Sequence, residues 1–502
     1  MSLASLHTIC LHRIYGLLKE GTWKFCITNP FSEFPTQDVN KLIEMTLLYL
    51  GEEDFPKIGD IILLLISGRL IRLDLDPFRP EREQDLIPKV TQTRASCISM
   101  RKFASHSKDL FIFHLVRNIT SGNPYLEEFH SPFHPGFDVF RNNQNLRILK
   151  LYDSCSTALR IANFPVDFSV LSSLRNLEVL HLPYMDTETI ANILEICPKL
   201  ISIGVTDSLD TMAEIHQRRL QNPSLNCAVG AHFQLRRCVW GKDGRRENPQ
   251  ERIRFCDKMR FAVTLCPLVQ ELIFYVHAKE AMKELRFLKQ LALLRIDFDG
   301  YEGDFVREFV ASLQEIGPQL KHLSIIWKEP YEENDGVPVD VICDCCPRLE
   351  SLEIDQFIFE PRFSSGASRN LPFKRLTLRN LWERDHESLL LLLSNCKHLE
   401  ELFLHEVECF GDALLSQIFQ RNPFTELKVV FAECCSLTRE GYQMFMEKAS
   451  SIEAVLINEE VENYFYDANR VFKDPNLRYL EDAYVCVKLR EFFYCRLNEK
   501  RF

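Results

Sequence analysis

Residues 349–354 read LESLEI, and residues 399–404 read LEELFL. Both stretches have apolar residues at their first, fourth and sixth positions, and charged residues fill most of the positions between them. A spacing of two residues between apolar positions is the period of a β-strand with one buried face. We therefore predict a short strand in each stretch, with buried side chains at Leu352, Ile354, Leu402 and Leu404.

The same pattern recurs along most of the chain. Clear copies begin at Leu146, Leu177, Leu200, Val269, Leu291, Leu320, Leu349, Phe373, Leu399, Phe424 and Ile452. From Val269 onward the starts are separated by 22, 29, 29, 24, 26, 25 and 28 residues. Such periods are typical of leucine-rich repeats, in which each unit contributes a strand and a helix. Because one unit cannot bury both elements alone, we predict an α/β leucine-rich-repeat solenoid (a horseshoe), with parallel strands on its concave side and helices outside.

A small residue marks the register of several units. Cys197, Cys266, Cys346 and Cys396 each precede the first apolar position by three residues, and Gly317 takes this place in another unit. A proline that follows three of these cysteines ends the preceding helix. We predict that the thiols are buried where the helix ends. The 18 scattered cysteines indicate free thiols in a reducing compartment, so we expect a cytoplasmic or nuclear protein.

Weaker copies extend the array toward both ends. LIRLDL begins at Leu70, LFIFHL begins at Leu110, and a weak candidate lies around Leu235. The predicted domains are a helical module at 1–55, repeats at 56–480 that are irregular at 76–145 and 206–260, and a C-terminal cap at 481–502.

Composition and motifs indicate a binding protein without catalytic chemistry of its own. The net charge of −11 argues against a nucleic-acid binder, and the longest apolar run is too short to span a membrane. The chain contains no Walker A loop, GxGxxG, GxSxG or HExxH. The CDCC run at 343–346 has no second ligand pair at zinc-like spacing. We therefore expect no cofactor, no bound metal and no catalytic residue.

The start of the chain carries a separate apolar stripe. In SLHTICLHRI at 5–14, the residues Leu6, Cys10 and Ile14 are spaced four apart, so they share one face of a helix. This pattern resembles the elongin-binding box of von Hippel–Lindau and SOCS-box substrate receptors. In that family the leucine enters a pocket of elongin C and the small residue lets the helices approach closely. The resemblance implies these roles for Leu6 and Cys10, with Ile14 extending the contact.

A second box follows the first. NPFSEFPTQDVNKLI at 29–43 resembles a cullin box, which implies that the contacts with a cullin are made by Phe34, Pro35, Val39 and Leu42. Two boxes ahead of leucine-rich repeats resemble the zyg-eleven family without its armadillo part, and that family uses a cullin-2-class scaffold. The resemblance implies a substrate-recognition subunit of a cullin-RING E3 ubiquitin ligase. Its partners would be elongin C, elongin B, the cullin and a protein substrate.

Two other interpretations remain open for the N-terminal residues. The stretch FPTQDVNKLIEMTLLYL at 34–50 also resembles the opening of an F-box, although the later cysteine and tryptophan section is not visible in 51–70. Alternatively, the first helix only caps the solenoid of a non-enzymatic scaffold, because an array of repeats needs a cap.

The substrate is expected on the concave surface. Strand residues that alternate with the buried positions point to that side of the sheet. They are Arg295, Asp297, Glu353, Asp355, Thr377, Arg379, Phe403, His405 and Lys428. Mixed charges with an exposed aromatic at Phe403 suit a polypeptide better than a nucleic-acid backbone.

Overall fold

The computed structural model describes residues 3–26, 28–48, 63–65, 67–74, 100–105, 116–117, 120, 123–131, 136–151, 166–182, 185–221, 232–241, 249–298, 305–327, 339–355, 371–381, 385–452 and 454–457. The chain forms two compact units, Met1–Thr206 and Asp207–Phe502. The predicted cap at 481–502 and the candidate strand at Leu110 lie outside the described residues.

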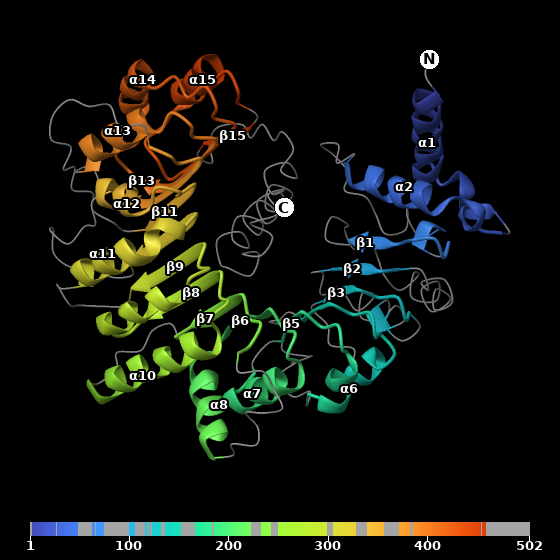
Figure 1. Ribbon diagram of the computed structural model, residues 1–502. Helices are drawn as coiled ribbons and strands as arrows, with labels where there is room; N and C mark the ends of the chain where they lie inside the picture. Colours follow the sequence, from blue (N-terminus) through green and yellow to red (C-terminus); the bar gives the residue numbers. More distant parts are fainter. Residues whose placement is uncertain are drawn as a thin grey trace. The chain divides into compact units, whose positions relative to one another are not determined.

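The described strands follow one another in chain order as neighbours in a sheet (Figure 1). They are β1 (Arg72–Asp74), β2 (Lys102–Ala104), β3 (Glu128–Ser131), β4 (Ile148–Leu151), β5 (Val179–His181), β6 (Ser202–Asp207), β7 (Arg237–Trp240), β8 (Glu271–Val276), β9 (Leu293–Phe298), β10 (His322–Trp327), β11 (Ser351–Asp355), β12 (Arg375–Leu381), β13 (Glu401–Val407), β14 (Val429–Glu433) and β15 (Ala454–Ile457). The described pairings are parallel, as for β11 with β12 and β12 with β13. Parallel strands in chain order with intervening helices confirm the predicted leucine-rich-repeat solenoid.

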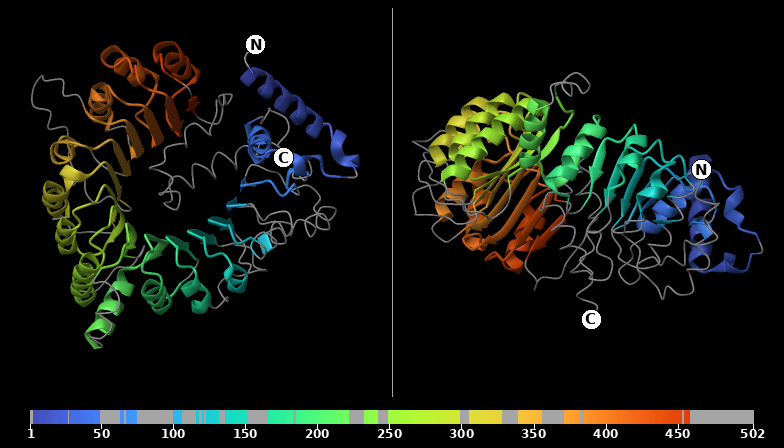
Figure 2. Two further views of the ribbon diagram at one scale, coloured as in Figure 1. Left: turned by 45° about the vertical axis from the view of Figure 1, so that its right-hand side comes forward. Right: turned by 90° about the horizontal axis from the view of Figure 1, so that it is seen from below.

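Helices lie in many of the connections between the described strands, and α1, α2, η1 and η2 precede β1. The α-helices are α1 (Leu3–Lys19), α2 (Thr36–Leu48), α6 (Phe168–Ser173), α7 (Thr187–Ile196), α8 (Leu209–Gln221), α10 (Pro249–Leu265), α11 (Phe305–Ile316), α12 (Val339–Cys345), α13 (His386–Asn395), α14 (Asp412–Arg421) and α15 (Arg439–Lys448). The 3-10 helices are η1 (Thr22–Phe25), η2 (Pro30–Glu33), η5 (Phe137–Phe140), η7 (Lys279–Phe287) and η8 (Gly317–Gln319). In the second unit, α10 to α13 lie along one face of the sheet (Figures 1 and 2).

Successive repeats are joined by a recurring pair of backbone hydrogen bonds. The carbonyl of Glu350, which follows the first apolar position, accepts the N–H groups of Lys374 (2.8 Å) and Arg375 (3.0 Å) in the next unit. The carbonyl of Lys374 accepts two N–H groups of the following repeat in the same way. Because each strand is fixed at its start by the preceding unit, the register is carried along the array.

The predicted core positions are confirmed. Leu352, Ile354, Leu402 and Leu404 are fully buried, and so are the repeat cysteines Cys266, Cys346 and Cys396, with Cys197 at 6% exposure. Gly317 replaces cysteine for a steric reason, since a Cβ on it would lie 2.4 Å from the carbonyl oxygen of Cys345 in the next repeat. Close approach of two backbones therefore requires glycine there.

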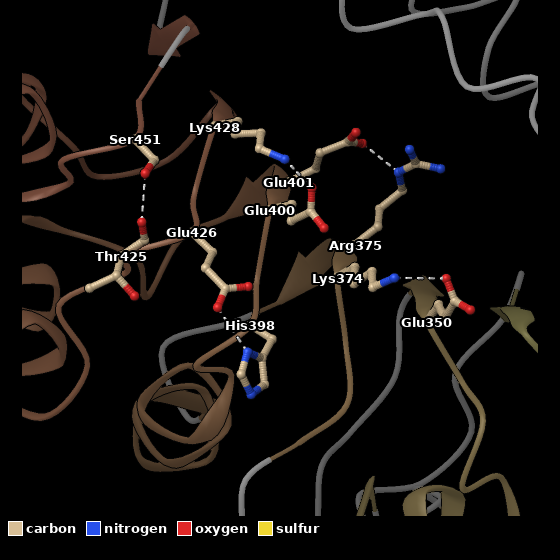
Figure 3. Close-up of polar contacts among 10 residues, drawn as sticks. All are labelled: Glu350, Lys374, Arg375, His398, Glu400, Glu401, Thr425, Glu426, Lys428 and Ser451. Atoms are coloured by element: carbon tan, nitrogen blue, oxygen red, sulfur yellow. Dashed lines mark hydrogen bonds and ion pairs between the residues drawn. The ribbon is translucent and has the colours of Figure 1, made fainter.

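Charged side chains alternate in sign along the edge where the strands begin (Figure 3). Lys374 Nζ lies 3.3 Å from Glu350 Oε2, and Lys428 is paired with Glu400. In the first unit, Arg147 Nη2 lies 2.7 Å from Glu178 Oε2 at the same repeat position. We name this series of pairs the edge ladder. Each pair links two consecutive repeats through side chains that are about one-third to one-half exposed.

Two details of the predicted register are wrong. The repeat predicted to start at Phe424 starts at Leu427, because Val430 pairs with Leu402 and Ala432 pairs with Leu404. In the first unit, β2 and β3 are strands that the pattern did not predict. Both have a buried serine, Ser105 or Ser131, where other repeats have an apolar residue.

Candidate functional site

Helix α1 has two apolar faces, and the chain buries only one of them. Leu11, Tyr15 and Leu18 are 2%, 6% and 3% exposed, and α1 contacts both α2 and η1. On the other side, Leu6 is 54% exposed, Ile9 is 49% exposed, and Cys10 is also exposed. We name Leu6, Ile9 and Cys10 the outer face of α1. Single exposed apolar residues are common, but three at positions i, i+3 and i+4 make a continuous stripe.

The predicted elongin-binding residues divide between exposed and half-buried positions. Leu6 and Cys10 belong to the outer face, whereas Ile14 is half-buried between the two sides of the helix. Ile9 was missed because it lies outside the four-residue spacing of the box. Its position three residues after Leu6 was the available signal.

Helix α2 separates α1 from the sheet. Its residues Val39, Leu42 and Ile43 are at most 3% exposed, and they form the core on which α1 packs. The interpretation of Val39 and Leu42 as cullin contacts is corrected by this burial, since a fully buried side chain cannot touch a partner. Of the four predicted cullin contacts, the half-buried Phe34 and the exposed Pro35 remain accessible.

Asn40 connects α2 to the first strand. Its side-chain Oδ1 accepts the N–H groups of Ile71 (3.1 Å) and Arg72 (3.2 Å), which start β1. Its Nδ2 donates to the carbonyl of Thr36 (2.6 Å) within α2. In the other repeats for which these bonds are described, a backbone carbonyl of the preceding repeat fills the place of this Oδ1. Thus α2, and not α1, closes the start of the sheet.

Polar and aromatic contacts hold this N-terminal region in one arrangement. His7 Nε2 of α1 lies 3.1 Å from Asp38 Oδ1 of α2. Asn29 accepts the N–H of Phe31 (3.0 Å) and donates to the carbonyl of Leu63 (2.6 Å). The ring of the fully buried Phe31 lies 5.3 Å from that of Phe34. The His7–Asp38 pair joins α1 to α2, and the contacts of Asn29 and Phe31 hold η2, which lies between these two helices in the chain.

The predicted substrate surface is more enclosed than the sequence suggested. Arg295 and Asp297 are 8% and 3% exposed, and they form a bidentate ion pair (Nε–Oδ1 2.9 Å, Nη2–Oδ2 3.2 Å). Burial raises the pKa of Asp297, and the two bonds to the guanidinium oppose that rise. Phe403, predicted to be exposed, is 9% exposed and lies beside Phe431. These three residues are therefore corrected from substrate contacts to parts of the packed sheet.

Other predicted substrate residues stay partly accessible. Glu353 accepts a hydrogen bond from Ser324 Oγ (2.7 Å) and lies 2.8 Å from Arg379 Nη2. Thr377 is half-buried, and the His405 side chain is 42% exposed. Lys428 is exposed but belongs to the edge ladder. Asp355 lies in β11, and its side chain is outside the described residues.

The cysteines have the properties of packing residues. Burial raises the pKa of Cys197 to about 11 and that of Cys346 to about 12, so both remain neutral thiols at physiological pH. Within the described part of the chain, no group of three or more His, Cys, Asp or Glu side chains could hold a metal ion. Among the described helices, none is long and apolar enough to cross a membrane.

These features define a leucine-rich-repeat protein that presents an apolar helix face beyond its N-terminal cap. No family model matches the sequence, and no curated protein matches it at a significant level. Among solved structures, an internalin from Listeria monocytogenes is 13% identical with a TM-score of 0.28, over 74% of this chain and 92% of that chain. A complex of Rad7 and Elc1 in yeast is 12% identical with a TM-score of 0.35, over 93% of this chain and 96% of that chain. Because both TM-scores are low, we assign the fold from the strand order and register of this chain itself.

Proposed function

We propose that this chain is a non-catalytic substrate-recognition subunit of a cullin-RING E3 ubiquitin ligase that binds elongin C, together with elongin B, through the outer face of α1. The observation that carries the proposal is the exposure of Leu6, Ile9 and Cys10 on a helix whose opposite face is buried. Leu6 and Cys10 are the positions at which the sequence resembles an elongin-binding box. Burying a leucine or isoleucine in a partner stabilises a complex by about 1.5–3 kcal/mol per side chain.

The position of the cap favours this proposal over a plain scaffold. A capping helix is needed to cover the first strand, and α2 performs that task through Asn40 and its buried face. The outer face of α1 contributes nothing to covering the sheet. An apolar stripe that the fold does not use suits a partner helix or groove.

The chain would act by recruitment. The repeats would hold a protein substrate while α1 fixes the chain to the ligase, which raises the effective concentration of the substrate near the ubiquitin-loaded partner. Phe34 and Pro35 would contribute to contact with a cullin-2-class scaffold. Such a protein acts in the cytoplasm or nucleus and needs no cofactor.

Co-purification with elongins B and C tests the proposal. We expect Leu6→Asp to weaken elongin binding by about 3 kcal/mol, more than a hundredfold, because a carboxylate would enter an apolar contact. The fold should persist, since Leu6 is 54% exposed. Tyr125→Asp is the matched control, because Tyr125 is also 54% exposed in the same unit but lies outside α1.

Three outcomes would contradict the proposal. Elongin binding that survives Leu6→Asp would exclude the outer face as the docking site. Recovery of the F-box adaptor Skp in place of the elongins would favour the F-box interpretation. Unfolding caused by Leu6→Asp would instead make α1 a structural cap.

A further inference from the structure

Gly16 lies inside helix α1, three residues before its last residue, Lys19. A Cβ added at Gly16 would meet no atom of the described part of the chain within 4 Å. Its backbone is helical, so no left-handed conformation requires glycine either. Glycine is a poor residue for a helix interior, and alanine would favour the helical state about three- to fivefold. Glycine at this position therefore destabilises α1, and the described residues give no steric reason for it.

The other glycines that the structure describes each have such a reason. Gly21 and Gly68 have φ angles of +69° and +73°, which favour glycine. At the remaining described positions a Cβ would lie at most 3.2 Å from another atom: Gly136, Gly204, Gly241, Gly317, Gly411 and Gly441. Gly441 is the nearest parallel, since it also lies in an α-helix, α15, but a Cβ there would lie 2.5 Å from Asp412 Oδ1. Gly16 is therefore the exception among the described glycines.

Gly16 lies on the same side of α1 as the outer face. It follows Ile9 by seven residues, which is nearly two whole turns of a helix, so the two residues share one side. Ile9 is 49% exposed and Gly16 is half-buried, so both reach the surface. Arg13 lies between them and is exposed, and a long arginine side chain can lay its apolar stem along a contact while its charge stays in water. A partner on the outer face can therefore extend its contact to Gly16.

A helix surface that lacks a side chain allows a close contact. The distance between two packed helices depends on the side chains where they cross, and glycine lets the backbones approach. At Gly16 the described part of the chain leaves open the space that a side chain would fill. A backbone or side chain of a partner can occupy this space, and its burial offsets the weaker helix of the free chain.

We propose that elongin C packs against the backbone of α1 at Gly16, so that Gly16 determines which partner surface fits this side of the helix. The inference rests on the proposed function, because the partner is taken to be elongin C. It adds a contact two turns along the helix from Ile9, at a position that the elongin-binding box of the sequence does not include. Glycine at this position favours binding and disfavours the free helix.

Gly16→Ala in the full chain separates these two effects. We expect amide exchange in α1 of the free chain to slow about three- to fivefold, because alanine stabilises the helix. We expect the affinity for the purified complex of elongins B and C to fall at least about tenfold, because the methyl group would occupy the contact. Isothermal titration calorimetry measures the affinity. Gly16→Leu should weaken binding further and still fold, since the described part of the chain leaves the position open.

Gly441→Ala is the matched control, because it makes the same substitution in a helix of the second unit. Its Cβ would lie 2.5 Å from Asp412 Oδ1, so we expect the amides of α15 to exchange faster and the elongin affinity to stay unchanged. Thermal unfolding curves establish that each variant is folded. A gain in helix stability together with a loss of affinity, seen at Gly16 alone, cannot result from unfolding.

The inference is overturned if Gly16→Ala binds the elongin complex as tightly as the wild-type chain, or more tightly because its helix is better formed. The proposed function would survive that result. Loss of binding in Leu6→Asp with full binding in Gly16→Leu would likewise confine the contact to the outer face itself. A wild-type chain that does not bind the elongin complex would overturn both the inference and the proposed function.

Discussion

In the later repeats for which these bonds are described, a backbone carbonyl of the preceding repeat accepts two N–H groups at the start of each strand. The side-chain oxygen of Asn40 has this role for the first strand. It accepts the two N–H groups at the start of β1, at 3.1 and 3.2 Å. The first strand therefore begins in the same register as strands that have a preceding repeat. The sequence did not predict this role, because any polar residue can occupy a polar position of an amphipathic helix. The spacing alone does not distinguish an asparagine that caps a strand from one that faces solvent.

Replacement of Asn40 tests this cap at the residue scale. Asn40→Ala removes both acceptor bonds, and we expect the local stability of β1 to fall by about 1 kcal/mol. Hydrogen exchange of the β1 and β2 amides measures the change. Asn145→Ala is the control, since exposed Asn145 makes one bond to the carbonyl of Pro124 (3.1 Å). Equal exchange rates in the two variants would show that Asn40 does not close the sheet.

The exposed fraction of an individual strand residue was harder to predict than the face of the sheet on which its side chain lies. The alternating pattern correctly placed Leu352 and Ile354 in the core. It could not show that Arg295 and Phe403 are enclosed, because enclosure depends on the side chains of adjacent strands. Those neighbours are set by register, which places Ile273 and Ser324 beside Arg295.

At the scale of the element, the sequence predicted strands wherever all three apolar positions are strongly hydrophobic. It failed at β2 and β3, whose third positions are the buried Ser105 and Ser131. It shifted the start of the β14 repeat by three residues, because Phe424 imitates a first apolar position and Ala432 gives a weak third one.

The edge ladder predicts an effect of charge reversal on the second unit. Lys374→Glu replaces the pair with Glu350 by a repulsion, and we expect a loss of about 0.5–1 kcal/mol in unfolding free energy. Adding Glu350→Lys should recover part of the loss, because opposite charges are restored at this pair while the new carboxylate at position 374 still lies beside Glu400 in the next repeat. Urea unfolding at low salt measures both variants, and 1 M salt should reduce the difference. A loss that neither the second substitution nor salt reduces would assign Lys374 a non-electrostatic role.

At the scale of the whole molecule, different parts of the chain carry different tasks. Helix α2 closes the sheet, repeats joined by backbone bonds and the edge ladder build the scaffold, and α1 offers an apolar face that the fold does not use. The sequence located the stripe on α1 but could not show that it remains exposed. That required knowing which helix covers the first strand.

Hydrogen–deuterium exchange of the full chain with and without purified elongins B and C tests the central claim most directly. Binding through the outer face should slow exchange in α1 (Leu3–Lys19), because the partner raises the free energy of local opening. Exchange in β8 to β13 should be unchanged, and Leu6→Asp should remove the protection. Absence of binding, or a complex in which α1 exchanges as fast as in the free chain, would contradict the account.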